Sequence, residues 1–253
     1  MLNDLKNVLF EAVLDTTNNN SSSSFAVAFS GGIDSSLLAK VCKDLGIKIT
    51  LLTIGFPLSR DIEFSKQIAL KLDLPHKVSV LIPEHFQKDL LYIQQKINCG
   101  NVSHIENCIA YFYIARMAKQ NNLQLILTAN GCDELFCGYN KFRLIYDEGE
   151  KRIIDLMEES ISNERVLIKE IETITTQFGI VTKQPLFSEK FINFAKRIPI
   201  QQKITGSDDF MRKHILRKLA LLMDIPRESA MKSKSALQYS SLIHRNFRLA
   251  NKK

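Results

Sequence analysis

A serine- and glycine-rich string near the N-terminus has residue types that could bind phosphate. Ser30-Gly31-Gly32-Ile33-Asp34-Ser35-Ser36 separates an apolar stretch from a helical segment. Adjacent glycines let the backbone turn tightly, so successive N–H groups can point at one anion, and the following helix N-terminus adds partial positive charge. The serine hydroxyls supply further donors, and Asp34 suits a magnesium ion that bridges phosphates. The string lacks the lysine of GxxxxGK[ST] and is therefore not a Walker A loop.

A second motif contains two adjacent acids. Thr128-Ala129-Asn130-Gly131-Cys132-Asp133-Glu134-Leu135-Phe136-Cys137-Gly138-Tyr139 follows an apolar stretch over 123–128. Acids at the carboxyl end of a strand, across from Asp34, are what a second magnesium ligand would look like. The alternative is that Asp133-Glu134 only caps a helix, and the presence of the first motif makes that alternative the weaker one.

The segments around these motifs predict an α/β fold. Strands are expected over 25–29, 48–54, 77–81 and 123–128, and helices over 35–45, 61–73, 83–97 and 104–120. Strands that are apolar throughout and separated by helices indicate a parallel, doubly wound sheet covered on both faces. Ligands of such sheets bind beyond the carboxyl ends of the strands. The loops after Phe29, Ile54 and Thr128 should therefore converge.

The rest of the chain is predicted to be helical. Residues 2–14 have the pattern of an amphipathic helix, and the polar stretch 16–24 is expected to be a flexible linker. No strand is expected beyond about residue 140, where helices are predicted over 150–162, 164–178, 188–197 and 208–223, the last with Ser207-Asp208-Asp209 as its N-cap. We therefore expect a helix and linker over 1–24, an α/β domain over 25–145 and a helical C-terminal subdomain over 146–253.

Composition excludes several classes of protein. The sequence is 45% hydrophobic, and no apolar run reaches the roughly 20 residues that a membrane span needs. The N-terminus lacks the basic start and apolar block of a secretory signal, so a cytoplasmic protein is expected. Five cysteines, an odd number without a CxxC pair, argue against a disulfide framework and a zinc ribbon. Cys132 and Cys137 are expected to be small packing residues.

The net charge of +7 is concentrated near the C-terminus. Residues 1–140 contain 12 Lys and Arg against 13 Asp and Glu, whereas residues 210–253 contain 11 against 2. A basic segment can be a solvated surface, a source of active-site cations or a nucleic-acid surface. We rank these three interpretations in that order.

Both motifs resemble those of a known family. The first string is similar to the SGGxDS loop of ATP pyrophosphatases, which hold pyrophosphate as a leaving group while an oxygen attacks the α-phosphorus; NAD, GMP, argininosuccinate and tRNA-lysidine synthetases share it. The second resembles the SGEGSDE(L/V)FGGY segment of asparagine synthetases and β-lactam synthetases. Three later stretches are similar to asparagine synthetase segments, namely 181–188 (E-x-R-x-P-F-L-D), 211–217 (E-K-H-I-L-R) and 232–234 (R-x-K). The likeness covers roughly residues 2–245.

The resemblance implies a PP-loop fold of the adenine nucleotide alpha hydrolase type and an ATP-dependent amide-forming ligase that uses Mg²⁺. A carboxylate, first of all the aspartate side chain, would be adenylated with release of pyrophosphate, and ammonia would then give asparagine and AMP. Lys234 would be the principal catalytic cation, followed by Lys213, with Asp133. The implied nucleotide-binding residues are Phe29, Ser30, Gly31, Gly32, Asp34, Ser35, Ser36, Ile54, Thr128, Ala129 and Gly131. Asn130 and Glu134 would contact the substrate, and Asp34 and Asp133 the metal.

Some residues depart from the family pattern. The Gly-Glu of the second motif is Ala129-Asn130, which removes a negative charge, and the Asp of P-F-L-D is Ser188. Leu2 stands where a glutaminase domain has its cysteine nucleophile, so we expect the ammonia to be free or to come from a separate glutaminase subunit. A homodimer is the other partner considered. Neither nucleic acid nor a membrane is expected as a partner. Two alternatives stay open: an RNA-modifying ATP pyrophosphatase, and a non-catalytic ATP-binding relative.

Overall fold

Over the described residues, the sheet has five strands in the order β3-β2-β1-β4-β5, and every neighbouring pair is parallel. The structure is a computed structural model and describes residues 1–18, 24–96, 101–234 and 236–251. The strands are β1 (Phe25–Ala28), β2 (Ile49–Gly55), β3 (His76–Val80), β4 (Leu125–Leu127) and β5 (Val181–Lys183). The predicted parallel, doubly wound sheet is confirmed.

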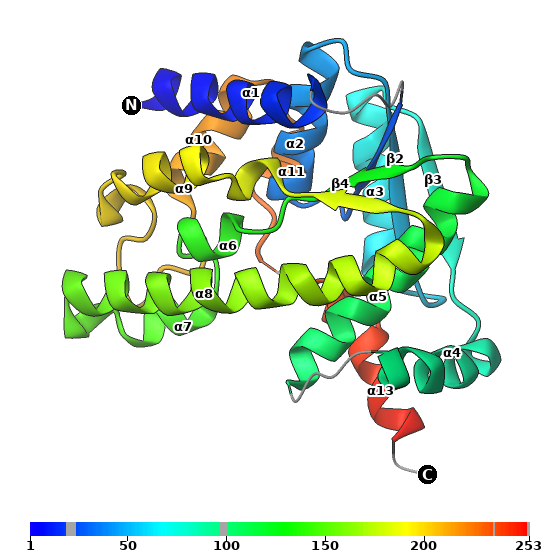
Figure 1. Cartoon of the computed structure of the whole chain (residues 1–253). Coiled ribbons are helices and arrows are strands. Elements are labelled where there is room, and N and C mark those ends of the chain that lie inside the picture. The colour runs from blue at the N-terminus through cyan, green and yellow to red at the C-terminus, as the bar shows by residue number, and fades with distance from the viewer. Residues whose placement is uncertain (19–23, 97–100, 235, 252–253) are drawn as a thin grey trace.

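Helices cover both faces of this sheet (Figure 1). The longer ones are α1 (Leu2–Asn18), α2 (Ile33–Asp44), α3 (Arg60–Leu72), α4 (Pro83–Lys96), α5 (Val102–Gln120), α8 (Glu150–Thr175), α9 (Glu189–Lys196), α10 (His214–Leu222) and α13 (Ile243–Ala250). Short helices are α6 (Cys132–Leu135), α7 (Asn140–Leu144), α11 (Arg227–Ala230) and α12 (Leu237–Ser240). No helix of the described ranges is long and apolar enough to cross a membrane.

Two hydrophobic cores lie on the two faces of the sheet. One joins α1, α2, α9 and α10, and the other joins α4, α5, α13 and the C-terminal half of α8. The amphipathic pattern expected over 2–14 is confirmed in α1, which buries Leu5, Leu9 and Val13 in the first core. Cys132 and Cys137 are buried, which confirms that they are packing residues.

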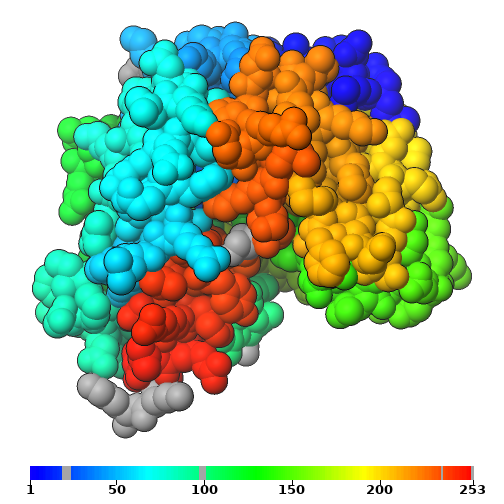
Figure 2. Space-filling model, turned by 180° about the vertical axis from the view of Figure 1, so that it is seen from behind, coloured from blue at the N-terminus to red at the C-terminus, as the bar shows by residue number. Residues whose placement is uncertain are grey.

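Seen from behind, C-terminal segments lie against part of the N-terminal half of the chain (Figure 2). The orange and red segments lie against the cyan segment that contains α3. Lys71 of α3 forms an ion pair with Glu228 of α11, and Lys232 Nζ lies 3.6 Å from Asp61 Oδ1. Residues separated by more than 150 positions in sequence are therefore held side by side, as in the Lys71–Glu228 pair, whose separation is 157.

The expectation that no strand follows residue 140 is wrong. β5 pairs with β4 at the edge of the sheet, with Thr182 opposite Ile126. Only the central residue of β5 is buried, so its three residues show no apolar run that could mark a strand. The region after residue 146 is otherwise helical, as expected.

Two helix boundaries also differ from prediction. The helices expected over 150–162 and 164–178 are one helix, α8, followed by a short 3-10 turn over 176–178. The helix expected over 208–223 begins only at His214, because Arg212 and Lys213 have left-handed backbone conformations, φ +47° and +53°. Asp209 accepts hydrogen bonds from the N–H groups of Met211 and Arg212 in the turn before the helix, so 207–209 is not the N-cap.

Some predictions fall on residues outside the described ranges. Residues 16–18 of the expected linker belong to α1, and 19–23 lie outside the description. The same holds for the last residue of the helix predicted over 83–97 and for Cys99.

Candidate active site

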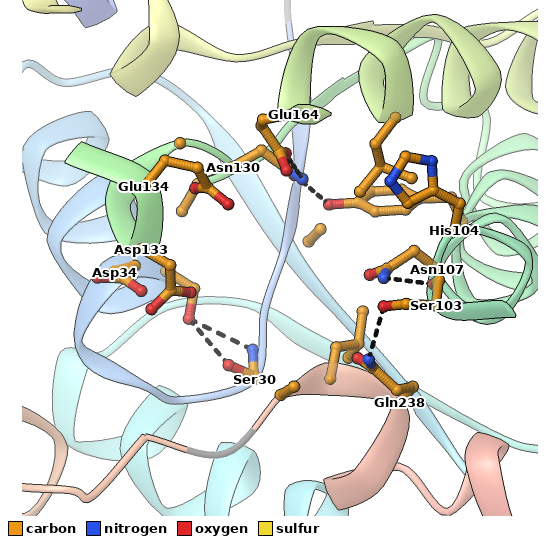
Figure 3. Close-up of a pocket in the computed structure, with 18 of the residues that line it drawn as sticks. Ser30, Asp34, Ser103, His104, Asn107, Asn130, Asp133, Glu134, Glu164 and Gln238 are labelled. Atoms are coloured by element: carbon orange, nitrogen blue, oxygen red, sulfur yellow. Dashed lines mark hydrogen bonds between the residues drawn. The ribbon is translucent and has the colours of Figure 1, made fainter. Parts of the chain in front are cut away.

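A cavity of 330 Å³ lies where β1, β2 and β4 end. Phe29 and Ile54, the last residues of the first two predicted strands, and Ala129, the first residue after the predicted strand 123–128, line it together. The opposite wall is formed by α5, α8 and the segment around α12, with Ser103, Asn107 and Gln238 facing Asp34 and Asp133 across the space (Figure 3).

The serine- and glycine-rich string forms one end of this cavity. Gly31 has φ +71°, and a Cβ there would lie 2.9 Å from the ring of Phe64, so the turn requires glycine. Ser30 and Ser35 line the cavity, and their hydroxyl oxygens lie 3.5 Å apart. The string then opens α2, whose N-terminus adds positive potential. This local geometry suits an anion.

Four charged side chains from four segments meet beside this loop. Lys213 Nζ lies 2.6 Å from Asp34 Oδ2 and 2.7 Å from Asp133 Oδ1, and Lys234 Nζ lies 2.5 Å from Asp133 Oδ2. We call Asp34, Asp133, Lys213 and Lys234 the lysine side of the cavity. Burial opposes ionisation of Asp133, but the two lysines outweigh it and lower its pKa below the usual range. Burial likewise opposes the charge of Lys213, yet the two aspartates raise its pKa.

Arg217 holds the two lysine-bearing segments together. Its guanidinium donates to the carbonyls of Met211 and Arg212, just before Lys213, and to those of Ala230 and Lys232, just before Lys234. These bonds also stabilise the two successive left-handed residues, a conformation that costs about 1–3 kcal/mol at each position. A single arginine therefore fixes the approach of both ammonium groups.

The basic segment near the C-terminus is thus partly an interior feature. Arg212, Lys213 and Arg217 are buried, whereas Lys218 and Arg227 are exposed. The first-ranked interpretation, a solvated surface, is wrong for the buried three, because ion pairs and carbonyl oxygens compensate their charges inside the protein.

The other end of the cavity holds two carboxyl groups with neutral partners. Glu164 of α8 accepts a hydrogen bond from Asn130 Nδ2 at 2.6 Å, and Asn130 Oδ1 accepts one from the Tyr111 hydroxyl at 2.6 Å. Glu134 Oε1 accepts a bond from the Tyr139 hydroxyl at 2.5 Å. We call these five residues the glutamate side.

Burial and like charge act on both carboxyls of the glutamate side. Burial, together with the negative charges of Glu164 and Asp133, raises the pKa of Glu134 well above its ordinary value. Burial also raises the pKa of Glu164, against the effect of the bond from Asn130. Sequence patterns did not predict Glu164 as a site residue, because its helix shows only ordinary amphipathic spacing. One face of this helix lines the cavity through residues about one helical turn apart, namely Ser160, Glu164 and Leu167.

A small hydrogen-bond chain supports the wall at Phe29. The Thr53 hydroxyl donates to the Phe29 carbonyl at 2.5 Å, and His76 Nε2 lies 2.8 Å from the same hydroxyl oxygen. The His76 ring also packs edge-on against the Phe29 ring, with centroids 5.9 Å apart. Burial lowers the pKa of His76 to about 4, so the imidazole is neutral at pH 7.

Most residues predicted for the site line the cavity. They are Phe29, Ser30, Asp34, Ser35, Ile54, Ala129, Asn130, Gly131, Asp133, Glu134 and Lys234. Lys213 lies behind the aspartates, and Gly31 and Gly32 shape the loop without facing the space. Ser36 and Thr128 are fully buried away from it. The Ser36 hydroxyl contacts Ser229, whose hydroxyl also donates to the Gly31 carbonyl, so Ser36 supports the loop from behind.

The lysine side has oxygen atoms suited to a magnesium ion. Asp34 Oδ1 is buried and has no hydrogen-bond partner in the described part of the chain. The carboxylates of Asp34 and Asp133 approach one point closely enough to share Lys213 Nζ. Over the described residues no group of three or more His, Cys, Asp or Glu side chains could form a closed metal site. Two carboxylates beside a loop whose geometry suits an anion are nonetheless a set that Mg²⁺ commonly uses, since phosphates and water would complete its shell.

Comparison with solved structures supports the fold. NMN synthetase from Francisella tularensis superposes with a TM-score of 0.52 over 94% of this chain and 76% of its own, at 16% sequence identity. At this identity the likeness concerns the fold alone.

Sequence comparisons identify the family. A putative glutamine-hydrolyzing asparagine synthetase from Methanocaldococcus jannaschii is 27% identical over 178 residues, which cover 70% of this chain and 33% of that protein. Asparagine synthetase B from Escherichia coli is 24% identical over 236 residues, or 84% of this chain and 41% of that protein. The chain therefore spans well under half the length of these relatives. The family model for asparagine synthase matches residues 4–166, most of the chain and both motifs, and the protein belongs to this family.

Proposed function

We propose that this chain is an AMP-forming carbon–nitrogen ligase that activates a carboxylate, the aspartate side chain first of all, and transfers the acyl group to ammonia. The observation that carries the proposal is the convergence of Asp34, Asp133, Lys213 and Lys234 beside the serine- and glycine-rich loop, at the edge of a cavity of 330 Å³. Membership in the asparagine synthase family supports it.

In this proposal the phosphates and the adenine of ATP occupy different parts of the cavity. The loop over 30–36 and the N-terminus of α2 would hold the β- and γ-phosphates, with Ser30 and Ser35 as hydroxyl donors. Phe29 and Ile54 would flank the adenine. Asp34 and Asp133 would hold Mg²⁺, which when bound would neutralise part of the phosphate charge.

The reaction would take place between the two sides. A carboxylate oxygen of the substrate attacks the α-phosphorus, the bond to the bridging oxygen breaks, and pyrophosphate leaves with the electron pair. Lys234 would stabilise the negative charge that accumulates at this step, and Lys213 would hold both aspartates in place. Ammonia then attacks the acyl carbon and AMP leaves. Holding the acyl-adenylate and the amine together in one cavity would supply much of the rate.

Product analysis tests the proposal. With ATP, Mg²⁺, ammonia and L-aspartate, we expect equal amounts of AMP, pyrophosphate and asparagine. A panel of other carboxylic amino acids should be run in parallel because Asn130 and Ser188 depart from the family pattern. Formation of ADP and phosphate, or binding of ATP without pyrophosphate release for every member of the panel, would contradict the proposal.

The RNA-modifying alternative receives little support. Its basis was the basic segment over 210–253, and Arg212, Lys213 and Arg217 of that segment are buried against protein groups. Phosphate contacts with RNA would require these side chains at the surface.

A further inference from the structure

The cavity has charge compensation on one side only. On the lysine side each aspartate has an ammonium partner within 2.7 Å. On the glutamate side, Glu134 and Glu164 are 3% and 6% exposed, and throughout the described ranges neither forms an ion pair with Lys, Arg or His. The nearby imidazole of His104 pairs instead with Glu170, at 2.8 Å.

Two buried carboxyl groups without a cation lack compensation for their charged forms, and a cationic ligand can supply it. Burial of a carboxylate is costly unless a positive charge or several donors compensate it. Asn130 and Tyr139 each provide one neutral donor, to Glu164 and Glu134 respectively. A protonated amine, with three N–H donors and a full charge, would interact far more strongly with this pair in a cavity of low dielectric constant.

The position of the pair relates this missing compensation to the substrate. Asp133, which contacts Lys234, lines the same cavity as Glu134 and Glu164. A molecule that reacts beside Lys234 and fills this cavity would therefore meet both glutamates. Figure 3 shows Glu164 and Asn130 next to Glu134, on the wall that adjoins Asp133. The family has a glutamate where this chain has Asn130, and Glu164 brings a carboxylate to that same amide from α8.

We infer that Glu164, together with Glu134, selects a substrate that carries a protonated amine near the carboxylate to be activated, and that Glu164 restores the negative charge absent at position 130. The inference deepens the proposed function and rests on it for the identity of the reacting carboxylate. It names Glu164 as a specificity-determining residue outside both sequence motifs.

Paired ligands test the inference by binding, independently of turnover. Calorimetry would use the full chain with Mg²⁺ and an ATP analogue with a methylene bridge between the α- and β-phosphorus atoms. L-Aspartate is compared with succinate and L-glutamate with glutarate, which differ in the amine. In at least one of these pairs, the amino acid should bind to the wild type about 10- to 100-fold more tightly than the diacid that lacks the amine. This is the difference expected for a charged hydrogen bond.

Two variants assign the effect. Glu164→Gln keeps an oxygen that can accept the hydrogen bond from Asn130. It should reduce the ratio of affinities between the amino acid and the diacid at least 10-fold, as expected for the loss of one charged hydrogen bond. Glu159→Gln, an exposed position on the same helix, should keep the preference. Denaturant unfolding should show that Glu164→Gln is as stable as the wild type.

The outcomes separate this inference from the proposed function. Equal binding of both members of each pair, binding of neither, or an unchanged preference in Glu164→Gln would overturn the inference even if pyrophosphate is released. Conversely, an amine preference that depends on Glu164, found without pyrophosphate release, would support the inference and contradict the proposed ligase reaction.

Discussion

The two sides of the cavity each contain two acidic residues, but the partners of these residues differ. Asp34 and Asp133 are matched by Lys213 and Lys234 from the C-terminal segments, whereas Glu134 and Glu164 have only neutral donors. Each aspartate of the lysine side therefore has a cationic partner within the described part of the protein, and neither glutamate of the glutamate side does. We therefore expect the charge of a ligand to change its binding free energy most at the glutamate side, where the buried carboxyl groups have no cation.

Removal of a cation from the lysine side should give the largest effect. Lys213→Met leaves two buried carboxylates with reduced compensation and should lower the free energy of unfolding by about 3–5 kcal/mol. Urea unfolding at pH 7 measures this, and Mg²⁺ should return part of the loss by binding Asp34 and Asp133. The control is Lys218→Met, because Lys218 is an exposed residue of α10, the helix that begins directly after Lys213. Equal midpoints for both variants would show that the lysine side does not depend on Lys213.

Lys234 separates catalysis from stability on the same side. Its side chain is 25% exposed, so Lys234→Ala should unfold near the wild-type midpoint. Loss of a fixed charge that stabilises the transition state should reduce the rate of pyrophosphate release by about 100- to 1,000-fold. Steady-state kinetics should show the loss in kcat and little change in KM for ATP. A loss confined to KM would mean that Lys234 contributes to binding alone.

Gly138 tests how closely the lysine side is packed. A Cβ at this position would lie 2.0 Å from Asp133 Oδ1 and 2.3 Å from Lys213 Cε. Gly138→Ala should displace both groups and reduce pyrophosphate release by about 100-fold, since displacements of about 1 Å at a reacting centre have effects of this size.

Gly46→Ala is the matched control for Gly138→Ala. Gly46 has φ +71° and open space around a new Cβ, so the substitution should cost about 1 kcal/mol of stability and leave activity unchanged. If both variants were fully active, the packing around Asp133 would not matter for the reaction.

The smallest expected effect is a change of stability with pH, caused by His76 behind the cavity wall at Phe29. His76 has a pKa of about 4 in the folded protein and about 6.5 when unfolded, because burial disfavours its charge. Below pH 6.5 the unfolded chain takes up a proton that the folded chain does not, so stability falls as pH drops from about 6.5 to 4. With its partial exposure taken into account, the loss should be about 1–2 kcal/mol.

Comparison of the wild type with a His76 variant separates the contribution of His76 to the pH dependence of stability from the contributions of the carboxyl groups. His76→Gln should show a smaller loss of unfolding free energy between pH 7 and pH 4.5 than the wild type. An identical loss in both proteins would mean that His76 already carries its charge in the fold.

Prediction from sequence succeeded where the relevant residues are contiguous. The loop over 30–36 and the acids at 133–134 each lie at the end of an apolar strand, so topology alone brings them to one edge of the sheet. Glu164 could not be found in this way, because its place in the site depends on how α8 packs across the cavity.

Other features were hidden for local reasons. The left-handed conformations of Arg212 and Lys213 are held by the guanidinium of Arg217, five residues after Arg212, and by the carbonyl of Gly138, which accepts from Arg212 across 74 residues. Nothing in the residue types reveals them. β5 exists because the edge of β4 offers backbone partners to residues 181–183, only one of which is buried.

The contacts of Lys213 and Ser229 bear on how the protein is made. Lys213 meets Asp34 across a sequence separation of 179 residues, and Ser229 meets the Gly31 carbonyl across 198. A ribosome produces Asp34 before Lys213, so a nascent chain carries this aspartate without that counterion until 179 further residues have been added. Assembly of this centre consequently waits for the segment that contains residues 213–234, and chains truncated before residue 213 would lack both of its lysines.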